Sequence, residues 1–198
     1  MAKVVDYFLS PASPYAYMGG PRLLAIARAG GAEIRIKPIN MGQIFPVTGG
    51  LPLPKRAPAR QAYRLVELAR WREHLGLPMN VEPKFFPVAD LSAALLLVAA
   101  RQSGGDALAL SNAVMRAVWE QARDIADRAT LRAVADEAGF DGAALLGRLE
   151  DPAVAAEYQA NTDEALRLGV FGVPWCVYKG VPYWGQDRLD FLERALRD

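Results

Sequence analysis

The sequence predicts an α/β protein, in which a small mixed sheet is interrupted by a large all-helical insertion. Three observations lead to this prediction. The chain opens with a strand–helix–strand pattern over residues 4–39, shows only helical patterns over residues 61–168, and ends with a strand–strand–helix pattern over residues 174–196. The 198 residues suffice for one sizeable core, and an apolar fraction of 52% is typical of a packed globular protein.

The N-terminal pattern is a βαβ unit. Residues 4–9, a short apolar run, and residues 32–39 both look like strands, and a helix is expected over residues 14–29 between them. Ser13 is a favoured N-cap residue, and Pro14 occupies the first helical position, where its missing N–H costs nothing. Because βαβ crossovers are right-handed and join parallel strands, the two strands are expected to run parallel.

Residues 40–60 are expected to be irregular. The glycines and prolines of residues 49–54 break regular structure, and Lys55, Arg56 and Arg60 make this loop basic. These three cations could meet a substrate carboxylate, although a solvated basic loop is the simpler interpretation.

Helical periodicity fills the rest of the middle of the chain. Asp90 or Ser92 can cap one of these helices, and Thr130 and Asp151 are candidate caps of two others. The expected helices cover residues 61–75, 92–102, 106–122, 130–138, 142–149 and 152–168.

The C-terminal segment returns to the sheet. Residues 174–178 and 181–184 are expected strands joined by a two-residue turn, and residues 187–196 form an amphipathic helix. The resulting order of elements is that of the thioredoxin architecture with a helical lid. We therefore divide the chain into a thioredoxin-like domain (residues 1–45 and 169–198) and a helical insertion domain (residues 46–168).

Composition excludes several functional classes. The net charge of +1 provides no basic field for nucleic acid or for an anionic membrane surface. Residues 91–100 form the most apolar segment, which is too short to span a bilayer, and the first residues lack the pattern of a secretory leader. The single cysteine, Cys176, excludes an internal disulfide and a cysteine-based metal cluster, so a cytoplasmic location without a metal site is expected.

Three motifs together resemble a known family. In chain order they are Ser13-Pro14-Tyr15-Ala16-Tyr17, Phe171-Gly172-Val173-Pro174 and Trp184-Gly185-Gln186-Asp187-Arg188-Leu189. This ordered set resembles the 2-hydroxychromene-2-carboxylate isomerases and the related kappa-class glutathione transferases, which belong to the DsbA-like branch of thioredoxin folds. The resemblance covers essentially the whole chain. It implies glutathione as the cofactor, a small aromatic carboxylate as the substrate, and a homodimer.

The resemblance also implies a set of site residues. Ser13 would face the glutathione sulfur, with Ser10 as the alternative because it begins a second Ser-Pro pair. Val173 would precede a cis-proline, Pro174. The γ-glutamyl end of glutathione would lie along Trp184, Gly185, Gln186 and Asp187.

The residue types at these positions fit thiolate chemistry. A dithiol oxidoreductase of this fold needs two cysteines at the start of its first helix, where this chain has Ser13 and Ala16, so the reactive sulfur must come from a ligand. A helix N-terminus and a hydroxyl donor could lower a thiol pKa of ~8.5 by about 2 units. Ser13 is expected to act as this donor and not as a nucleophile, because the only histidine, His74, is expected to end an insertion helix.

The two other motifs have their own physical logic. A cis bond at Pro174 would turn the N–H and C=O of Val173 toward the cysteinyl backbone of glutathione, which would lie like an added antiparallel strand. An ordinary strand-opening proline is the alternative. Asp187 would either complement a helix dipole or accept a hydrogen bond from the γ-glutamyl ammonium group.

The sequence thus predicts a glutathione-dependent isomerase of 2-hydroxychromene-2-carboxylate-type substrates, acting by reversible thiolate addition and cis–trans isomerisation of the ring-opened form. One alternative is a kappa-like glutathione transferase or peroxidase, and another is a non-catalytic glutathione- or thiol-binding module. Gly50 and Ala89 stand where the family often has asparagine, which leaves the aromatic substrate open.

Overall fold

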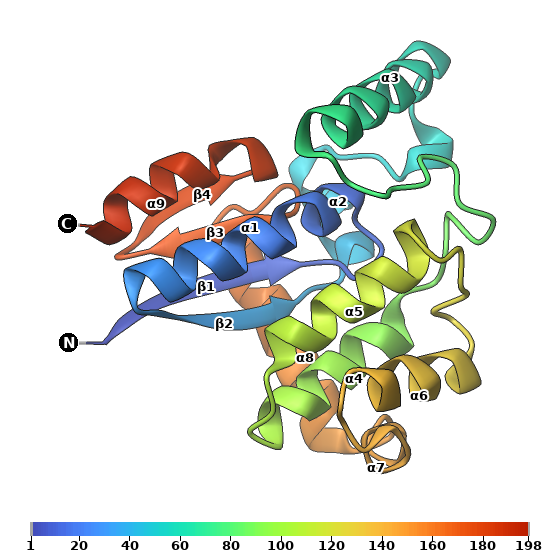
Figure 1. The fold of residues 1–198 in the computed structure, drawn as a ribbon, viewed down its shortest axis with the longest axis vertical. Coiled ribbons are helices and arrows are strands. Elements are labelled where there is room, and N and C mark those ends of the chain that lie inside the picture. The colour runs from blue at the N-terminus through green and yellow to red at the C-terminus, as the bar shows by residue number, and fades with distance from the viewer. Residues whose placement is uncertain (1, 198) are drawn as a thin grey trace.

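The structure is a computed structural model that describes residues 2–197. Its centre is a four-stranded sheet in the order β2-β1-β3-β4, formed by β1 (Lys3–Leu9), β2 (Ala32–Pro38), β3 (Trp175–Tyr178) and β4 (Val181–Trp184). β1 and β2 are parallel, whereas β3 is antiparallel to both β1 and β4 (Figure 1). The predicted mixed sheet, which the N- and C-terminal parts of the chain build together, is therefore confirmed.

The two faces of the sheet are covered by different helices. Alternate residues of a strand point to opposite faces. Val5 and Tyr7 belong to the cluster that contains α1 (Pro14–Gly30) and α9 (Leu189–Arg197), while Phe8 packs with residues of α2 (Met41–Thr48) and α8 (Pro152–Arg167). Figure 1 shows α1 and α9 lying side by side along one face.

The insertion shares its core with the sheet. Its remaining helices are α3 (Pro58–Leu75), α4 (Leu91–Gln102), α5 (Ala107–Trp119), α6 (Arg128–Glu137) and α7 (Gly142–Gly147). Side chains of α4 and α5 belong to the same buried cluster as those of β1 and α1, because α5 packs directly against α1. By contrast, α3 projects beyond the N-terminal end of α1 (Figure 1). The domain boundaries at residues 45 and 168 stay a prediction.

The segment 40–60 is more regular than expected. Met41–Thr48 forms α2, and Leu53–Lys55 forms one 3-10 turn, η1, so the prediction of an irregular loop is wrong there. The side chain of Asn40 caps α2 by accepting a hydrogen bond from the Gly42 N–H at 2.9 Å. The Asn40 N–H donates in turn to the Thr162 hydroxyl of α8 at 3.0 Å, and this long-range contact anchors the helix start.

Two of the predicted caps need correction, and one is confirmed. α6 begins at Arg128 and is capped by Asp127, whose carboxylate accepts from the Thr130 N–H at 2.9 Å, so Thr130 is not the cap. Asp151 caps α8 as predicted, by accepting from the Ala153 N–H at 2.9 Å. Asp90 occupies the N-cap position of α4 but makes no capping bond, and Ser92 lies inside the helix.

The helix boundaries differ from the predictions by a few residues. α3 begins at Pro58, three residues before the expected start at residue 61, and α5 ends at Trp119 instead of residue 122. The predicted turn at Lys179 and Gly180 is confirmed, because both residues have the positive φ of a two-residue hairpin turn, 49° and 78°. In residues 2–197, no helix combines the length and apolarity needed to cross a bilayer.

Candidate active site

Sheet pairing brings the three sequence motifs to one edge of the sheet. Phe8 pairs with Trp175, and Trp175 pairs with Trp184, so the end of β1, the start of β3 and the end of β4 are neighbours. The Gly185 N–H donates to the Pro174 C=O at 2.9 Å, which ties the second motif to the third. α1 follows β1 directly, so its N-terminus opens at this same edge.

Ser13 lies at the N-cap of α1, as predicted. Its Oγ accepts a hydrogen bond from the Ala16 N–H at 3.2 Å, and the residue is 8% exposed. No acceptor for its hydroxyl proton exists within residues 2–197. The positive end of the α1 dipole lies at this hydroxyl, so the site favours an anionic atom that accepts from Ser13.

Ser10 has a different environment. Its hydroxyl donates to Asp90 Oδ2 at 2.5 Å, and its C=O accepts from the Ser13 N–H at 3.0 Å. Burial raises the pKa of the Asp90 carboxyl, and hydrogen bonds from Ser10 and from the Ala12 backbone oppose this rise. Ser10 therefore joins the loop before α1 to the start of α4, and its hydroxyl is already engaged.

The Val173–Pro174 peptide bond is cis, as expected from the motif. Val173 lies just before β3, and neither its N–H nor its C=O has a hydrogen-bond partner within residues 2–197. Two exposed aromatic rings flank this position: the Phe171 ring lies 4.7 Å from that of Trp184 and 5.1 Å from that of Trp175. A peptide-like ligand could therefore pair with the Val173 backbone beside an aromatic surface.

The third motif forms a tight turn. Gly185 has a φ of 92°, and a Cβ there would lie 2.4 Å from Asp187 Oδ1, so only glycine fits without rearrangement. Gln186 is buried, and its Cβ lies so close to α1 that a Cβ on Gly19 would be 3.1 Å from it. Asp187 is exposed and accepts from Arg188 Nη1 at 2.7 Å. The structure thus gives Asp187 a cationic partner from its own chain.

The other reactive groups lie away from this edge or are inert. Cys176 is buried in β3 opposite Tyr7, and burial raises the pKa of its thiol to about 12. His74 lies in the last turn of α3, with its ring edge-on to Trp71 at 5.5 Å. The described part of the chain contains no group of three His, Cys, Asp or Glu side chains that could hold a metal ion.

Sequence reasoning missed one charged group beside the α1 N-terminus. Arg64 of α3 is buried, although a helical arginine gives no sequence signal for burial. Burial raises the pKa of the Tyr15 hydroxyl. The charges of Arg64 and Arg56 lower this pKa, and those of Glu67 and Asp187 raise it. Tyr15 therefore lies between the helical insertion and the turn that follows β4.

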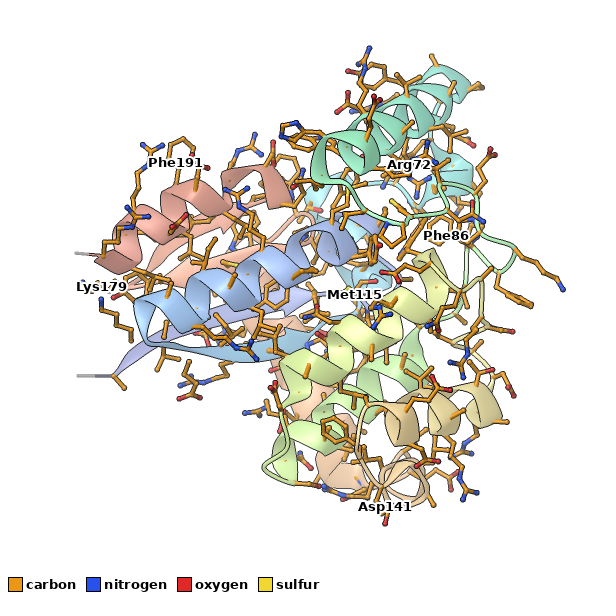
Figure 2. All side chains as sticks on the ribbon, in the orientation of Figure 1. Arg72, Phe86, Met115, Asp141, Lys179 and Phe191 are labelled. Atoms are coloured by element: carbon orange, nitrogen blue, oxygen red, sulfur yellow. The ribbon has the colours of Figure 1, made fainter. Side chains whose placement is uncertain are left out.

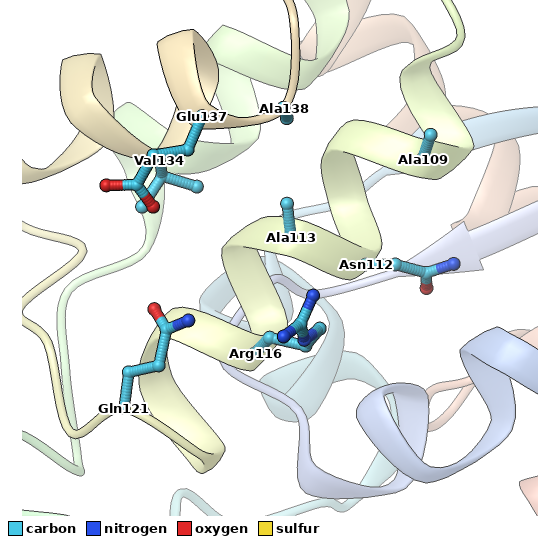
Figure 3. A pocket seen from close by; sticks show the side chains of 8 residues that line it. All are labelled: Ala109, Asn112, Ala113, Arg116, Gln121, Val134, Glu137 and Ala138. Atoms are coloured by element: carbon cyan, nitrogen blue, oxygen red, sulfur yellow. The ribbon is translucent and has the colours of Figure 1, made fainter.

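The structure also explains one departure from the family pattern. A Cβ at Gly50 would lie 2.3 Å from the ring of Phe45, so an asparagine would displace this ring. A cavity of about 290 Å³ lies elsewhere, between α5 and α6, and is lined by residues such as Asn112, Arg116 and Glu137 (Figure 3). None of the predicted site residues lines it.

Comparison with known proteins places this fold and its three motifs in a family. Residues 4–197 match the family model of the DSBA-like thioredoxin domain. The chain belongs to the DSBA-like thioredoxin domain family. Both the predicted fold class and the resemblance to the isomerase and kappa-transferase group are confirmed for this DSBA-like protein.

Three relatives illustrate its place within the family. A 2-hydroxychromene-2-carboxylate isomerase of Sphingobium xenophagum is 29% identical and is covered over 100% of both chains. Glutathione S-transferase kappa 1 of Homo sapiens is 26% identical, with 99% of this chain and 92% of the relative covered. The solved structure of a 2-hydroxychromene-2-carboxylate isomerase superposes with a TM-score of 0.84 at 27% identity, covering 98% of this chain and 94% of that one. These similarities support the prediction of an enzyme of the isomerase type.

Proposed function

We propose that this DSBA-like protein is a glutathione-dependent isomerase of 2-hydroxychromene-2-carboxylate-type aromatic substrates. The observation that carries the proposal is the Ser13 hydroxyl, which is buried at the N-terminus of α1 and has no acceptor for its proton in the described part of the chain. A cysteine occupies this position in a dithiol oxidoreductase of this fold, and the single cysteine of this chain is buried in β3. The names of its full-length relatives support both the reaction and the thiol cofactor.

The residues present fit glutathione at this edge of the sheet. The unpaired N–H and C=O of Val173 would hold the cysteinyl backbone as an added strand, while Trp184, Gly185, Gln186 and Asp187 would line the γ-glutamyl end. The Asp187 carboxylate would then exchange Arg188 for the ammonium group of the ligand, or accept hydrogen bonds from both cations. This exchange is inexpensive, because an exposed ion pair contributes only about 0–1 kcal/mol.

Bound glutathione would supply a thiolate that adds reversibly to the conjugated double bond of the ring-opened substrate, so that the resulting single bond can rotate before the thiolate leaves. Ser13 would donate its hydroxyl hydrogen bond to the sulfur, and the first-turn N–H groups of α1 would add their partial positive charge. The buried position of Ser13 strengthens this donation by limiting competition from water.

Two measurements test the proposal. Titration of the protein with glutathione at neutral pH should produce the ultraviolet absorption band of a bound thiolate. The protein should also interconvert 2-hydroxychromene-2-carboxylate and its ring-opened isomer when glutathione is present, without lowering the glutathione concentration. Binding of glutathione as the neutral thiol, or interconversion at the same rate without glutathione, would refute the proposed mechanism.

A kappa-type glutathione transferase is the second candidate, and the 26% identity to human glutathione S-transferase kappa 1 over 99% of this chain favours it. The same thiolate would then attack an electrophile and remain attached to it. Steady turnover that consumes one glutathione per product would identify this activity.

A further inference from the structure

Arg64 is a buried arginine whose side chain has no hydrogen-bond partner among the residues that the structure describes. The residue is 9% exposed, and Leu68 is the one other buried residue of α3. Its Nη2 atom is shielded from solvent, and no acceptor for it exists within residues 2–197. Burying an unpaired charged group is costly, so such a group in a folded protein points to a partner of another kind.

The surroundings of Arg64 are aromatic and electropositive. Its Cζ lies 4.9 Å from the centre of the Phe86 ring and 5.9 Å from that of Trp119, and these two rings are 4.7 Å apart. Burial lowers the pKa of Arg64, the charge of Tyr15 opposes this shift, and Arg56, a group of the same sign as Arg64, lowers the pKa further. The indole N–H of Trp119 is also buried and has no acceptor within residues 2–197.

The contacts of Arg64 with the two rings supply no hydrogen-bond acceptor to its guanidinium. An aromatic ring contacts the face of a guanidinium, whereas the N–H donors point outward in its plane. Two parallel N–H groups match the two oxygens of a carboxylate, and a flat aromatic group attached to that carboxylate can pack on neighbouring rings. Arg64, Phe86 and Trp119 therefore form a surrounding suited to an aromatic acid.

This cluster adjoins the candidate thiol site. α3 packs against α1, and the charge of Arg64 lowers the pKa of Tyr15, which follows Ser13 by two residues in the first turn of α1. Phe86 lies beneath α3, on the side of the N-terminal end of α1 (Figure 2). A small ligand held at Arg64 would thus approach the Ser13 hydroxyl.

We propose that Arg64 is a substrate-binding residue that holds the carboxylate of a planar aromatic acid, with the ring of that acid packed beside Phe86. The proposal rests on the proposed function, in which a thiolate at Ser13 must meet an aromatic carboxylate. Glutathione also carries carboxylates, but the aromatic setting of Arg64 favours the acid. The basic residues Lys55, Arg56 and Arg60, considered from sequence for this role, are less buried than Arg64.

The test compares an unreactive acid with its neutral isostere. Calorimetry in the presence of saturating glutathione measures the affinities of 2-naphthoate and 2-naphthamide for the wild-type protein and for Arg64→Met. The wild type should bind the acid at least tenfold more tightly than the amide, and Arg64→Met should lose this preference while its affinity for the amide is unchanged. Arg72→Met, which removes an exposed cation from the same helix, should keep the preference.

Each outcome decides the proposal. Equal wild-type affinities for acid and amide would overturn it, as would an undiminished preference in Arg64→Met. A loss of glutathione affinity in Arg64→Met, with naphthoate affinity intact, would assign the carboxylate to glutathione and also overturn it. Should Arg64→Met fail to fold by circular dichroism, a crystal structure of the wild type with 2-naphthoate decides, because the carboxylate must lie within hydrogen-bond distance of Arg64.

The same measurements separate this proposal from the proposed function. If the wild type binds no glutathione, the naphthoate titrations are repeated without it, and a preference that depends on Arg64 supports the carboxylate site although the proposed function fails. If glutathione binds as a thiolate but the affinity for naphthoate is the same in the wild type and in Arg64→Met, the proposed function stands and the Arg64 proposal fails.

Discussion

Replacing Ser13 with alanine removes a buried hydroxyl whose proton has no acceptor in residues 2–197. A hydrogen bond to a charged group contributes about 1.5–3 kcal/mol, and 1.36 kcal/mol corresponds to roughly one pKa unit. The pKa of the bound glutathione thiol should therefore rise by about 1–2 units in Ser13→Ala. From a bound-thiol pKa of about 6.5, this rise lowers the thiolate fraction at pH 7 about 3- to 25-fold, and the rate near neutral pH should fall by the same factor. Part of the thiolate stabilisation should survive, since the first-turn N–H groups of α1 remain.

The assay is a pH titration of the thiolate absorption band of bound glutathione in the wild type and in the variant. Ser13 also caps α1, so its loss should lower the free energy of unfolding by about 1 kcal/mol. Asp127→Ala is the matched control, because it removes the cap of α6 and should cost similar stability without moving the thiol pKa. An unchanged thiol pKa in Ser13→Ala would refute the reasoning. A raised thiol pKa in Ser10→Ala alone would transfer the role to Ser10.

Three further predictions concern stability and reactivity. Cys176, whose thiol pKa burial raises to about 12, should resist alkylation in the folded protein at neutral pH and react fully in denaturant, as measured by thiol titration; rapid labelling of the folded protein would contradict its burial. The raised pKa of Asp90 means that its contribution to folding is complete below its ordinary pKa of 3.8 and is lost as the pH rises through the raised value. In urea denaturation, Asp90→Asn should therefore gain stability relative to the wild type between acidic and neutral pH, and a constant difference would refute this. Gly185→Ala should lower the free energy of unfolding by about 1–3 kcal/mol, because residue 185 has a positive φ and its new Cβ would contact Asp187. Gly147→Ala is the control, because its Cβ would meet no atom within 4 Å. In the same assay it should be neutral or stabilise the protein by up to about 1 kcal/mol.

Those parts of the fold that depend on local signals were predictable from sequence. The turn at Lys179 and Gly180 follows from a short polar break between two apolar runs, and it fixes β3 and β4 as a hairpin. Ser13 before Pro14 marks the start of α1 in the same way. The joint role of the three motifs did not follow from these local signals, because only the family resemblance assigned all three to glutathione.

The missed features depend on contacts that the local sequence does not specify. α2 contains Pro46 and is followed by Gly49 and Gly50, a composition typical of a loop. In addition to the local cap by the Asn40 side chain, its start is anchored by the bond from the Asn40 N–H to Thr162, a residue 122 positions away. Arg64 is a comparable case, because Phe86 and Trp119 bury it from distant parts of the chain.

The sparse burial of α3 has an evolutionary consequence. Arg64 and Leu68 are its buried residues, so most substitutions along this 18-residue helix should change stability by no more than about 0.5 kcal/mol. The edge that would receive the tripeptide, by contrast, includes the main-chain groups of Val173 and the buried helix cap Ser13. Under the proposed function, substitutions along one helix could therefore change the aromatic specificity of a lineage while the thiolate site is inherited unchanged.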